Sequence, residues 1–274
     1  MPAAAPVTRP WLALHAARLA ELAPLPASAR VERLDAWARE AGLRTESGRA
    51  LRFVAEAGDG PVQAASQRTA YETRISETGE VATRIDPAGA RHDLYNALAW
   101  LAWPRSKARL NALHSAVLAA DAARSVGVGT ASRGPLRDAA TLFDENAALW
   151  VGLDASLEAA LRAFDWQALF VAGRAGVERA VRVHAFGHAL LEKLDAPFKA
   201  ITAHAWPLRL AADSPLPAVD AALAASLEPD RLASRAFCPL PVMGVPHWCD
   251  ANRDPAFYND AAVFRPGRRR APPG

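Results

Sequence analysis

Residues 92–125 constrain the fold of this chain more than any other segment, because apolar side chains recur at helical spacing through almost all of it. The stretch HDLYNALAWLAW at 92–103 is followed directly by Pro104 and then by RSKARLNALHSAVLAADAARS at 105–125. Proline breaks the interior of a helix but suits its first turn. The sequence therefore predicts two successive helices that meet at Pro104 and bury their apolar faces in one core.

Several segments before residue 154 also carry patterns of regular structure. Residues 28–42 place apolar side chains on one helical face and end at Gly42, which predicts a helix with a glycine cap. GRALRFV at 48–54 predicts a short strand, and the alternating side chains of 71–86 predict a β-hairpin with its turn at ETG. For 139–153 both a helix and a hairpin remain open, and the turn chemistry of its Asp-Glu-Asn sequence favours a second hairpin.

The second half of the chain is predicted to contain three helical segments before residue 235 and to be irregular beyond it. Helical patterns cover 153–170, 176–194 and 219–227. Residues 235–266 are rich in proline, asparagine, aspartate and aromatic side chains, and we expect them to wrap over the helices and to line a pocket. The fold class is therefore α+β and mainly helical, with one or two small hairpins and a long C-terminal wrap.

Composition and length favour one globular domain. The chain has 274 residues, of which 51% are hydrophobic and 22% are charged, and this is enough to bury a large core. We expect a domain at 28–266, an N-terminal extension at 1–27 and a disordered basic tail at 267–274. No apolar run approaches the roughly 18 residues that cross a bilayer, so no membrane contact is expected.

Two features of the sequence bear on the cellular compartment. The most apolar part of the N-terminal segment contains His15, Arg18 and Glu21, so it lacks the apolar core of a signal peptide, and we expect a cytoplasmic protein. Cys238 and Cys249 are separated by ten residues, which fits neither a redox pair nor a zinc knuckle. We expect two reduced thiols.

The basic residues concentrate at the C-terminus. The formal net charge of +3 becomes −1 without the four arginines at positions 265, 268, 269 and 270. The body of the protein is thus nearly neutral, which does not suit a dedicated nucleic-acid binder, although the tail could contact nucleic acid or another anion.

A row of metal-ligating side chains is predicted in the helix expected at 176–194. His184, His188 and Glu192 follow one another at a spacing of four, on the border between its polar and apolar faces. Gly187 leaves a gap in the apolar face through which another element could approach. Two imidazoles at this spacing can share a divalent ion such as zinc, with the carboxylate as third ligand or as the group that orients His188.

The same row also fits ordinary packing residues that are hydrogen-bonded to their neighbours. The zinc-protease motif places a glutamate directly after its first histidine, and here that position is Ala185. A protease of that class is therefore not expected.

A second polar row lies on the helix predicted at 105–125, where Lys107, Asn111, His114 and Asp121 share a face with leucines. Polar groups within an apolar stripe require partners. They either satisfy one another in an internal network or face a pocket for an anion, with Lys107 as the charge and His114 as an acid or base.

Further polar residues follow in the segment RGPLRDAATLFDEN. Arg137 and Asp138 precede the expected turn, and Asp144, Glu145 and Asn146 form it. Paired acids at a turn usually stabilise the local backbone. Opposite a histidine row, their oxygens would also suit a hard metal ion.

The motifs HDLYNALAWLAWPRSKARLNALH, RDAATLFDEN, FGHALLEKL and PLPVMGVPHW with FYNDAAVFRP occur in this order, and together the chain resembles a bacterial family known as domain of unknown function 3025. The resemblance covers residues 50–266 and implies a single bacterial module. The motif residues that it implies are Asn96, Lys107, Asn111, His114, Arg137, Asp138, Asp144, Glu145, His188, Glu192, Trp248, Asn252 and Tyr258. Two positions depart from the family pattern: Ala147, where glycine would tighten the turn, and His247, where glycine would be usual.

Three functional hypotheses follow. The first is a metal-dependent hydrolase that acts on an anionic, phosphate-bearing substrate. Its metal ligands would be His184, His188, Glu192 and Asp144. Its catalytic side chains would be His114, Lys107, Arg137 and Asp138. Its other binding residues would be Asn96, Asn111, Trp248, Asn252 and Tyr258. The second is a non-catalytic module that binds nucleic acid or protein, and the third is a metal-free enzyme in which His114 or His188 is the acid or base.

Overall fold

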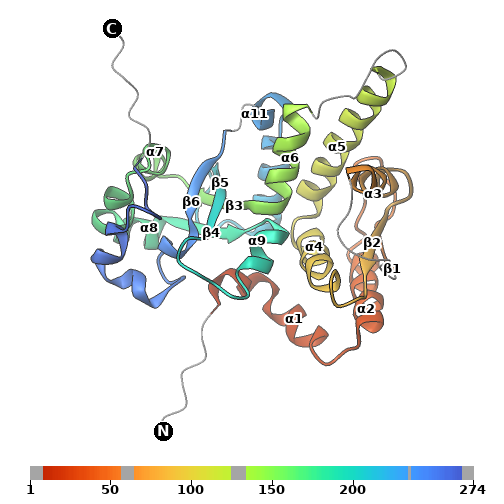
Figure 1. The fold of residues 1–274 in the computed structure, drawn as a ribbon, viewed down its shortest axis with the longest axis horizontal. Coiled ribbons are helices and arrows are strands. Elements are labelled where there is room, and N and C mark those ends of the chain that lie inside the picture. Colours follow the sequence, from red (N-terminus) through yellow and green to blue (C-terminus); the bar gives the residue numbers. More distant parts are fainter. Residues whose placement is uncertain (1–8, 57–64, 125–133, 234–235, 267–274) are drawn as a thin grey trace.

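The computed structural model describes residues 9–56, 65–124, 134–233 and 236–266, with side chains from Tyr71 on in the second range and up to Ala120. Helices surround a small central sheet, and a helical lobe formed by α2, α3, α4 and α5 stands beside it (Figure 1). The basic tail expected at 267–274 lies outside the described residues, as does the side chain of Asp121.

The bounds of the elements, in chain order, are as follows. The α-helices are α1 (Ala16–Leu22), α2 (Ala27–Glu40), α3 (Ala65–Thr78), α4 (Ala90–Ala102), α5 (Pro104–Arg124), α6 (Pro135–Asn146), α7 (Ala155–Ala163), α8 (Arg174–Ala180), α9 (His188–Lys193), α10 (Leu216–Ser226) and α11 (Pro229–Ala233). The strands are β1 (Arg52–Glu56), β2 (Glu80–Arg84), β3 (Ala147–Gly152), β4 (Val181–Ala185), β5 (Thr202–Leu208) and β6 (Cys238–Pro241). Short 3₁₀ helices span Pro10–His15, Val242–Gly244, Asp250–Arg253 and Pro255–Asn259, and a π-helical turn spans Ala168–Ala172.

The strands form two sheets. β1 and β2 are parallel and are joined by α3. The larger sheet has the order β4-β3-β5-β6, in which β3 is parallel to β5 and the two outer pairs are antiparallel. The mainly helical α+β class is therefore confirmed.

The larger sheet separates two hydrophobic cores. Side chains alternate along β3, so that Leu149 and Val151 face one core and Trp150 faces the other. The first core is closed by α6, α10 and α11 and contains Phe143. Every residue of β3 is buried because both faces of the strand are covered, and this explains its continuous apolar sequence.

The hairpin predicted at 71–86 is wrong. Residues up to Thr78 belong to α3, in which Tyr71 and Ile75 lie one turn apart and Ile75 is buried. Gly79 follows the helix with a φ of 78°, and only then does β2 begin. The ETG sequence therefore ends a helix, and β2 pairs with β1, which precedes the helix.

The second hairpin, predicted at 139–153, is also wrong. Leu136, Ala139, Ala140 and Phe143 recur at helical spacing in α6, whose hydrophobic side packs against β3 and β5. The Asp-Glu-Asn sequence forms the last turn of this helix, and β3 begins at the next residue. Ala147 has an extended backbone with φ −74° and ψ 147°, so no glycine is required there.

The single helix predicted at 176–194 is interrupted. Its first part is α8, but residues 181–185 form the edge strand β4, in which Val181 and Val183 supply β-branched side chains. A new helix, α9, begins at His188. His184 and His188 therefore lie on different elements, and the predicted row of three ligands does not form.

The helices at either side of Pro104 are confirmed, and an acid from another helix holds their junction. Asp220 of α10 accepts hydrogen bonds from the backbone N–H groups of Arg105 and Ser106 and from the Ser106 hydroxyl. These N–H groups lie in the first turn of α5, where they lack partners within the helix. The predicted glycine cap is also confirmed, because Gly42 follows α2 with a φ of 62°.

Both ends of the described chain pack onto the body. Trp11 and Leu22, from the segment expected as an extension, belong to the core that contains Trp150. The C-terminal segment adds β6 to the sheet and then continues as short 3₁₀ helices, as the predicted wrap requires. Cys238 and Cys249 are free thiols. Within the described ranges, no helix has both the length and the apolar character needed to cross a bilayer.

Candidate active site

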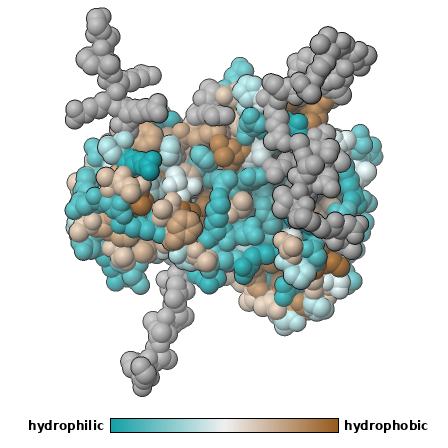
Figure 2. Space-filling view, in the orientation of Figure 1, coloured by the Kyte–Doolittle hydropathy of each residue, from teal (hydrophilic) through white to brown (hydrophobic). Residues whose placement is uncertain are grey.

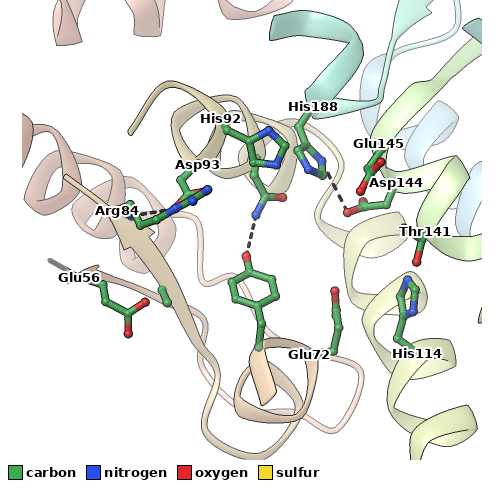
Figure 3. A pocket seen from close by; sticks show the side chains of 13 residues that line it. Glu56, Glu72, Arg84, His92, Asp93, His114, Thr141, Asp144, Glu145 and His188 are labelled. Carbon is green, nitrogen blue, oxygen red and sulfur yellow. Dashed lines mark hydrogen bonds and ion pairs between the residues drawn. The ribbon is translucent and has the colours of Figure 1, made fainter. Parts of the chain in front are cut away.

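A polar cavity of about 80 Å³ lies where α4, α5, α6 and α9 meet α3 and β2 (Figure 3). Its volume accommodates a few water molecules or a small polar group. Hydrophilic side chains gather on the surface in the middle of the molecule, around α9 and α4 (Figure 2). The lining residues are Glu56, Tyr71, Glu72, Ala82, Arg84, His92, Asp93, Asn96, His114, Thr141, Asp144, Glu145 and His188.

A buried lysine lies beneath the cavity. The Lys107 side chain of α5 is only 4% exposed, donates to Asn96 Oδ1 at 2.9 Å and forms an ion pair with Asp144. Its ammonium group also lies 5.6 Å from the centre of the Trp100 ring. Burial raises the pKa of Asp144, but the charge and hydrogen bond of Lys107 outweigh it together with the nearby His188 and His114, so this pKa lies below its ordinary value. Asp144 is therefore ionised, and the network joins α4, α5 and α6.

His188 faces this network from the first position of α9. Its Nδ1 lies 3.6 Å from Asp144 Oδ2. Burial lowers the pKa of His188 to about 3, because the opposing effect of Asp144 is smaller. The imidazole is therefore neutral at pH 7.

A close backbone contact sets the position of His188. A Cβ atom on the preceding Gly187 would lie 2.3 Å from the carbonyl oxygen of Glu145. Gly187 N–H also donates to Ala147 O at 2.9 Å. The absence of a side chain at Gly187 thus lets α9 approach the end of α6, which brings His188 to Asp144.

A histidine–carboxylate pair forms the opposite wall. His92 Nδ1 lies 2.9 Å from Glu192 Oε2, and the His92 ring meets the His188 ring edge to face at a centroid distance of 4.5 Å. The pair bridges α4 and α9, and a 2.6 Å hydrogen bond from Tyr95 OH of α4 to Asp195, just beyond the end of α9, lies nearby in the sequence. The His92 side chain is 33% exposed, so solvent and ligands can reach it.

The remaining wall is built from polar pairs. Arg84 forms a two-bond ion pair with Asp93 at 2.8 and 2.9 Å. Asn111 Nδ2 donates to Glu72 Oε2 at 2.7 Å, from beneath the cavity. The Asn96 side chain donates to Tyr71 OH at 2.6 Å, so one amide links Tyr71 to Lys107. Burial raises the pKa of the Tyr71 phenol well above its ordinary value, and it stays protonated.

The structure brings together eight of the candidate residues that the sequence predicted. Those at the cavity or in contact with its lining are Asn96, Lys107, Asn111, His114, Asp144, Glu145, His188 and Glu192. They come from four helices, so the arrangement exists only in the folded chain.

Residues 51–268 match the model of a family described as protein of unknown function DUF3025. The chain belongs to this family. The resemblance inferred from the sequence motifs is thus confirmed. Neither the curated proteins nor the solved structures provide a match.

Several motif residues of the DUF3025 chain lie away from the cavity. Arg137 and Asp138 occupy the first turn of α6 and are not among the lining residues. Asn252 is fully buried and donates to Met243 O and Val245 O at 2.9 and 2.7 Å. These amide bonds stabilise the C-terminal wrap.

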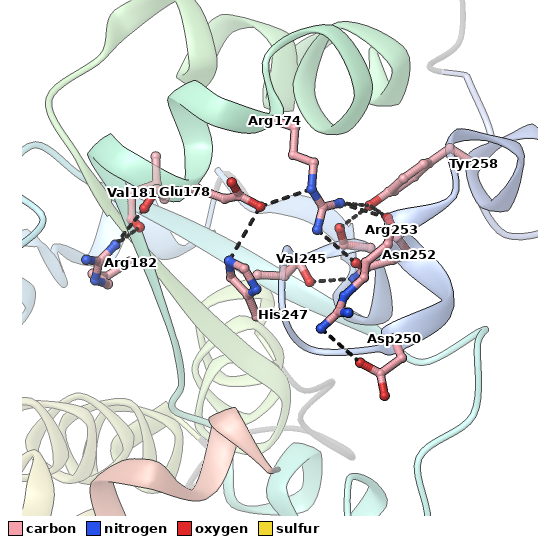
Figure 4. Close-up of polar contacts among 11 residues, drawn as sticks. Arg174, Glu178, Val181, Arg182, Val245, His247, Asp250, Asn252, Arg253 and Tyr258 are labelled. Atoms are coloured by element: carbon pink, nitrogen blue, oxygen red, sulfur yellow. Dashed lines mark hydrogen bonds and ion pairs between the residues drawn. The ribbon is translucent and has the colours of Figure 1, made fainter. Parts of the chain in front are cut away.

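Arg174 fastens this wrap to α8 (Figure 4). Its guanidinium donates to Asn252 O at 2.7 Å, lies 3.4 Å from Tyr258 OH and pairs with Glu178 at 3.0 Å. Tyr258 OH donates to Gly244 O at 2.8 Å, and burial raises the pKa of this phenol to about 12. The contacts of Asn252 and Tyr258 are therefore those of structural residues.

A second, mainly apolar cavity of about 500 Å³ lies between the N-terminal segment, β4 and the C-terminal wrap. His184 and Trp248 line it, with the Trp248 ring 5.7 Å from that of Trp11. His184 thus faces a different cavity from His188. His247, also in this lining, has a φ of 69°, a conformation that favours glycine, which is the residue that the resemblance implies at this position.

No three His, Cys, Asp or Glu side chains of the described ranges are placed to hold one metal ion. The predicted set is divided, because His184 lies in the second cavity and Glu192 contacts His92. A divalent ion at the first cavity would require new positions for His92, His188 or Asp144.

His92 is the main residue that the sequence reasoning missed. It precedes Asn96 by four positions, so both lie on one face of α4, like the lysine, asparagine and histidine of α5. This spacing was present in the sequence and could have identified His92. Glu72 and Arg84 could not be identified by helical spacing, because the sequence predicts a hairpin for their segment.

We expect the stability of the protein to fall between pH 7 and pH 5, partly because of His188. The unfolded chain binds a proton at this residue below about pH 6.5, whereas the folded chain does so only near pH 3. The unfolded state therefore gains protons first, which costs the folded state about 2 kcal/mol at pH 5. Urea unfolding at pH 7 and pH 5 measures the loss of unfolding free energy between the two pH values. This loss should be about 2 kcal/mol smaller in His188→Gln than in the parent protein. Equal losses in both proteins would show that His188 is protonated in the folded state.

Proposed function

We propose that this chain is an enzyme that performs general acid–base catalysis in the first cavity, with His92 as the base. The observation that carries the proposal is the 2.9 Å contact between His92 Nδ1 and Glu192 Oε2 at the cavity wall. A carboxylate at this distance accepts a hydrogen bond from Nδ1–H, and this favours the neutral tautomer in which Nε2 is unprotonated. Since the two ring nitrogens lie on opposite sides of the imidazole, Nε2 is the atom that can take a proton from a substrate.

The carboxylate also favours the product of that transfer. After proton abstraction, the imidazolium of His92 is paired with Glu192. In known enzymes, a carboxylate in this position orients the catalytic histidine and stabilises its charged form. Glu192 is a positioning residue, because it acts through His92. The proton returns from Nε2 to the substrate or to its product.

The surrounding network supports this chemistry by keeping the site rigid. Lys107, Asn96 and Asp144 fix three helices relative to one another, and the neutral His188 offers a hydrogen-bond acceptor next to Asp144. Burial of these groups strengthens their electrostatic interactions with a bound substrate.

The proposal keeps the metal-free form of the enzyme hypotheses but assigns to His92 the role that was predicted for His114 or His188. A metal-dependent hydrolase remains the competing form, since histidine and carboxylate side chains of the cavity are of the types that bind divalent ions. Five carboxylates and one guanidinium among the described lining residues do not favour a phosphate-bearing substrate.

The proposed activity can be tested without a known substrate. The purified protein is incubated with a metabolite extract in D₂O, and mass spectrometry follows metabolites that are consumed or that gain deuterium. We expect at least one such metabolite with the parent, and a rate about 10²–10⁴-fold lower with His92→Gln. Glu192→Gln should also lower the rate, because it removes the negative charge beside His92.

The matched control is His184→Gln, which changes a histidine of the second cavity and should leave the rate unchanged. Equal exchange by the parent and His92→Gln, or no change of any metabolite, would contradict the proposal. Loss of activity after dialysis against a chelator, with recovery on adding Zn²⁺, would establish the metal-dependent form instead.

A further inference from the structure

The described lining of the first cavity is strongly acidic. It contains the carboxylates of Glu56, Glu72, Asp93, Asp144 and Glu145 but only the guanidinium of Arg84. Even with Lys107 beneath the cavity, the formal charge of these groups is negative. A site of this sign raises the local concentration of cations.

A second, independent feature of the cavity also points to a ligand that donates protons. His188 is 6% exposed and lines the cavity, yet its Nδ1 makes no hydrogen bond. The 3.6 Å that separates Nδ1 from Asp144 Oδ2 is too long for one. A buried polar atom without a partner is costly, and a ligand that supplies the missing hydrogen bond would recover that cost.

Some of these carboxylates form ion pairs with a lysine or arginine of the protein. Asp93 is paired with Arg84, and Asp144 with Lys107. Among the described residues, Glu72 forms no ion pair with a lysine or arginine and accepts only from the amide of Asn111. Figure 3 shows the Glu72 side chain directed to the same space as Asp144 and His114. Glu72 is thus the carboxylate best placed to pair with a ligand.

The cavity therefore offers two kinds of acceptor to one small cation. Asp144 and Glu72 supply negative charge, and neutral His188, with its proton on Nε2, supplies the lone pair of Nδ1. An ammonium group has three N–H donors and no acceptor, which matches such a set. Its compact shape also suits a cavity of about 80 Å³.

We propose that the substrate of this site carries a primary ammonium group, which pairs with Glu72 and Asp144 and donates a hydrogen bond to His188 Nδ1. This inference rests on the proposed function, since it names the substrate class of the same cavity. The ammonium group is a binding group, and the proton that His92 removes comes from a neighbouring atom of the substrate.

Binding of simple probes tests the inference separately from turnover. The full chain, with ¹³C-labelled histidines, is titrated at pH 7 with butylammonium, butanol, butyrate and inorganic phosphate, and NMR follows the imidazole signals. Butylammonium should shift the His92 and His188 signals in a saturable manner, whereas the neutral and anionic probes should not. Glu72→Gln should weaken butylammonium binding about tenfold or more.

The control for the acidic variant is Glu178→Gln, which removes a carboxylate of the second cavity and should leave the affinity unchanged. Binding of butyrate or phosphate at these signals, or equal affinity for butanol, would overturn the inference. Stoichiometric binding of Zn²⁺ alone in place of butylammonium would show that the cation is a metal.

The outcomes also separate this inference from the proposed function. Butylammonium binding with no effect of His92→Gln on deuterium exchange would retain the ammonium site and reject the catalytic role. Exchange that depends on His92, together with no butylammonium binding, would retain the enzyme and reject the substrate class.

Discussion

Replacement of Lys107 by methionine is expected to lower the free energy of unfolding by about 3–5 kcal/mol, because it leaves the Asp144 carboxylate, whose side chain is only 16% exposed, without its counter-ion. Methionine preserves most of the length of the side chain. The loss of unfolding free energy is therefore caused mainly by removal of the charge and its hydrogen bonds. The amide oxygen of Asn96 also loses its donor. Urea unfolding at pH 7 measures this change.

Two further variants identify the cause of that loss. Adding Asp144→Asn to Lys107→Met removes the isolated charge and should restore part of the stability. Lys199→Met breaks an exposed ion pair with Asp260 and should cost less than about 1 kcal/mol. A cost of Lys107→Met as small as that of Lys199→Met would show that the buried network does not hold the three helices together.

The substitution Gly187→Ala is expected to destabilise the protein by about 3 kcal/mol, at the upper end of the usual cost of overpacking. The backbone of Gly187, with φ −65° and ψ 128°, is accessible to alanine, so the cost comes only from the added methyl group. That group would meet Glu145 O at 2.3 Å and Asn146 N at 2.5 Å. These are backbone atoms at the junction of α6 and β3, and they cannot move without displacing Asp144 from His188.

Gly176→Ala is the matched control for this substitution. Its Cβ would lie 3.7 Å from the nearest atom, a side-chain carbon of Leu157, which is an ordinary contact. Because Gly176 lies within α8, alanine there should be neutral or stabilise by up to about 1 kcal/mol. Thermal unfolding of both variants measures the difference. A change of less than about 0.5 kcal/mol for Gly187→Ala would contradict the close approach of α9 to the end of α6.

The parts of the fold that could be predicted from the sequence are those that local periodicity specifies. The helices on both sides of Pro104 repeat their apolar pattern over several turns, and their polar faces carried Asn96, Lys107, Asn111 and His114. Each of these side chains lies at or beneath the cavity in the structure. The helical face at 105–125 thus identified Lys107, Asn111 and His114 before the partner helices were known.

The wrong predictions involve short elements whose pairing is not local. β2 pairs with β1 across an intervening helix, and β4 is a five-residue strand between two helices. A five-residue strand also fits a helical pattern, so periodicity alone does not distinguish them. The wrong helix prediction had its largest effect on His184, because it placed this residue in one row with His188. In the structure, strand β4 directs His184 to the second cavity.

The most direct test of the central claim is the tautomer of His92. NMR of the protein with ¹⁵N-labelled histidines measures which ring nitrogen carries the proton, at a pH where the His92 ring is neutral. We expect the proton on Nδ1, hydrogen-bonded to Glu192, and no proton on Nε2. In Glu192→Leu this preference should be lost, because nothing then accepts the Nδ1 proton. A His92 ring that carries its proton on Nε2 in the parent protein would contradict the proposed base and with it the assignment of this cavity as an active site.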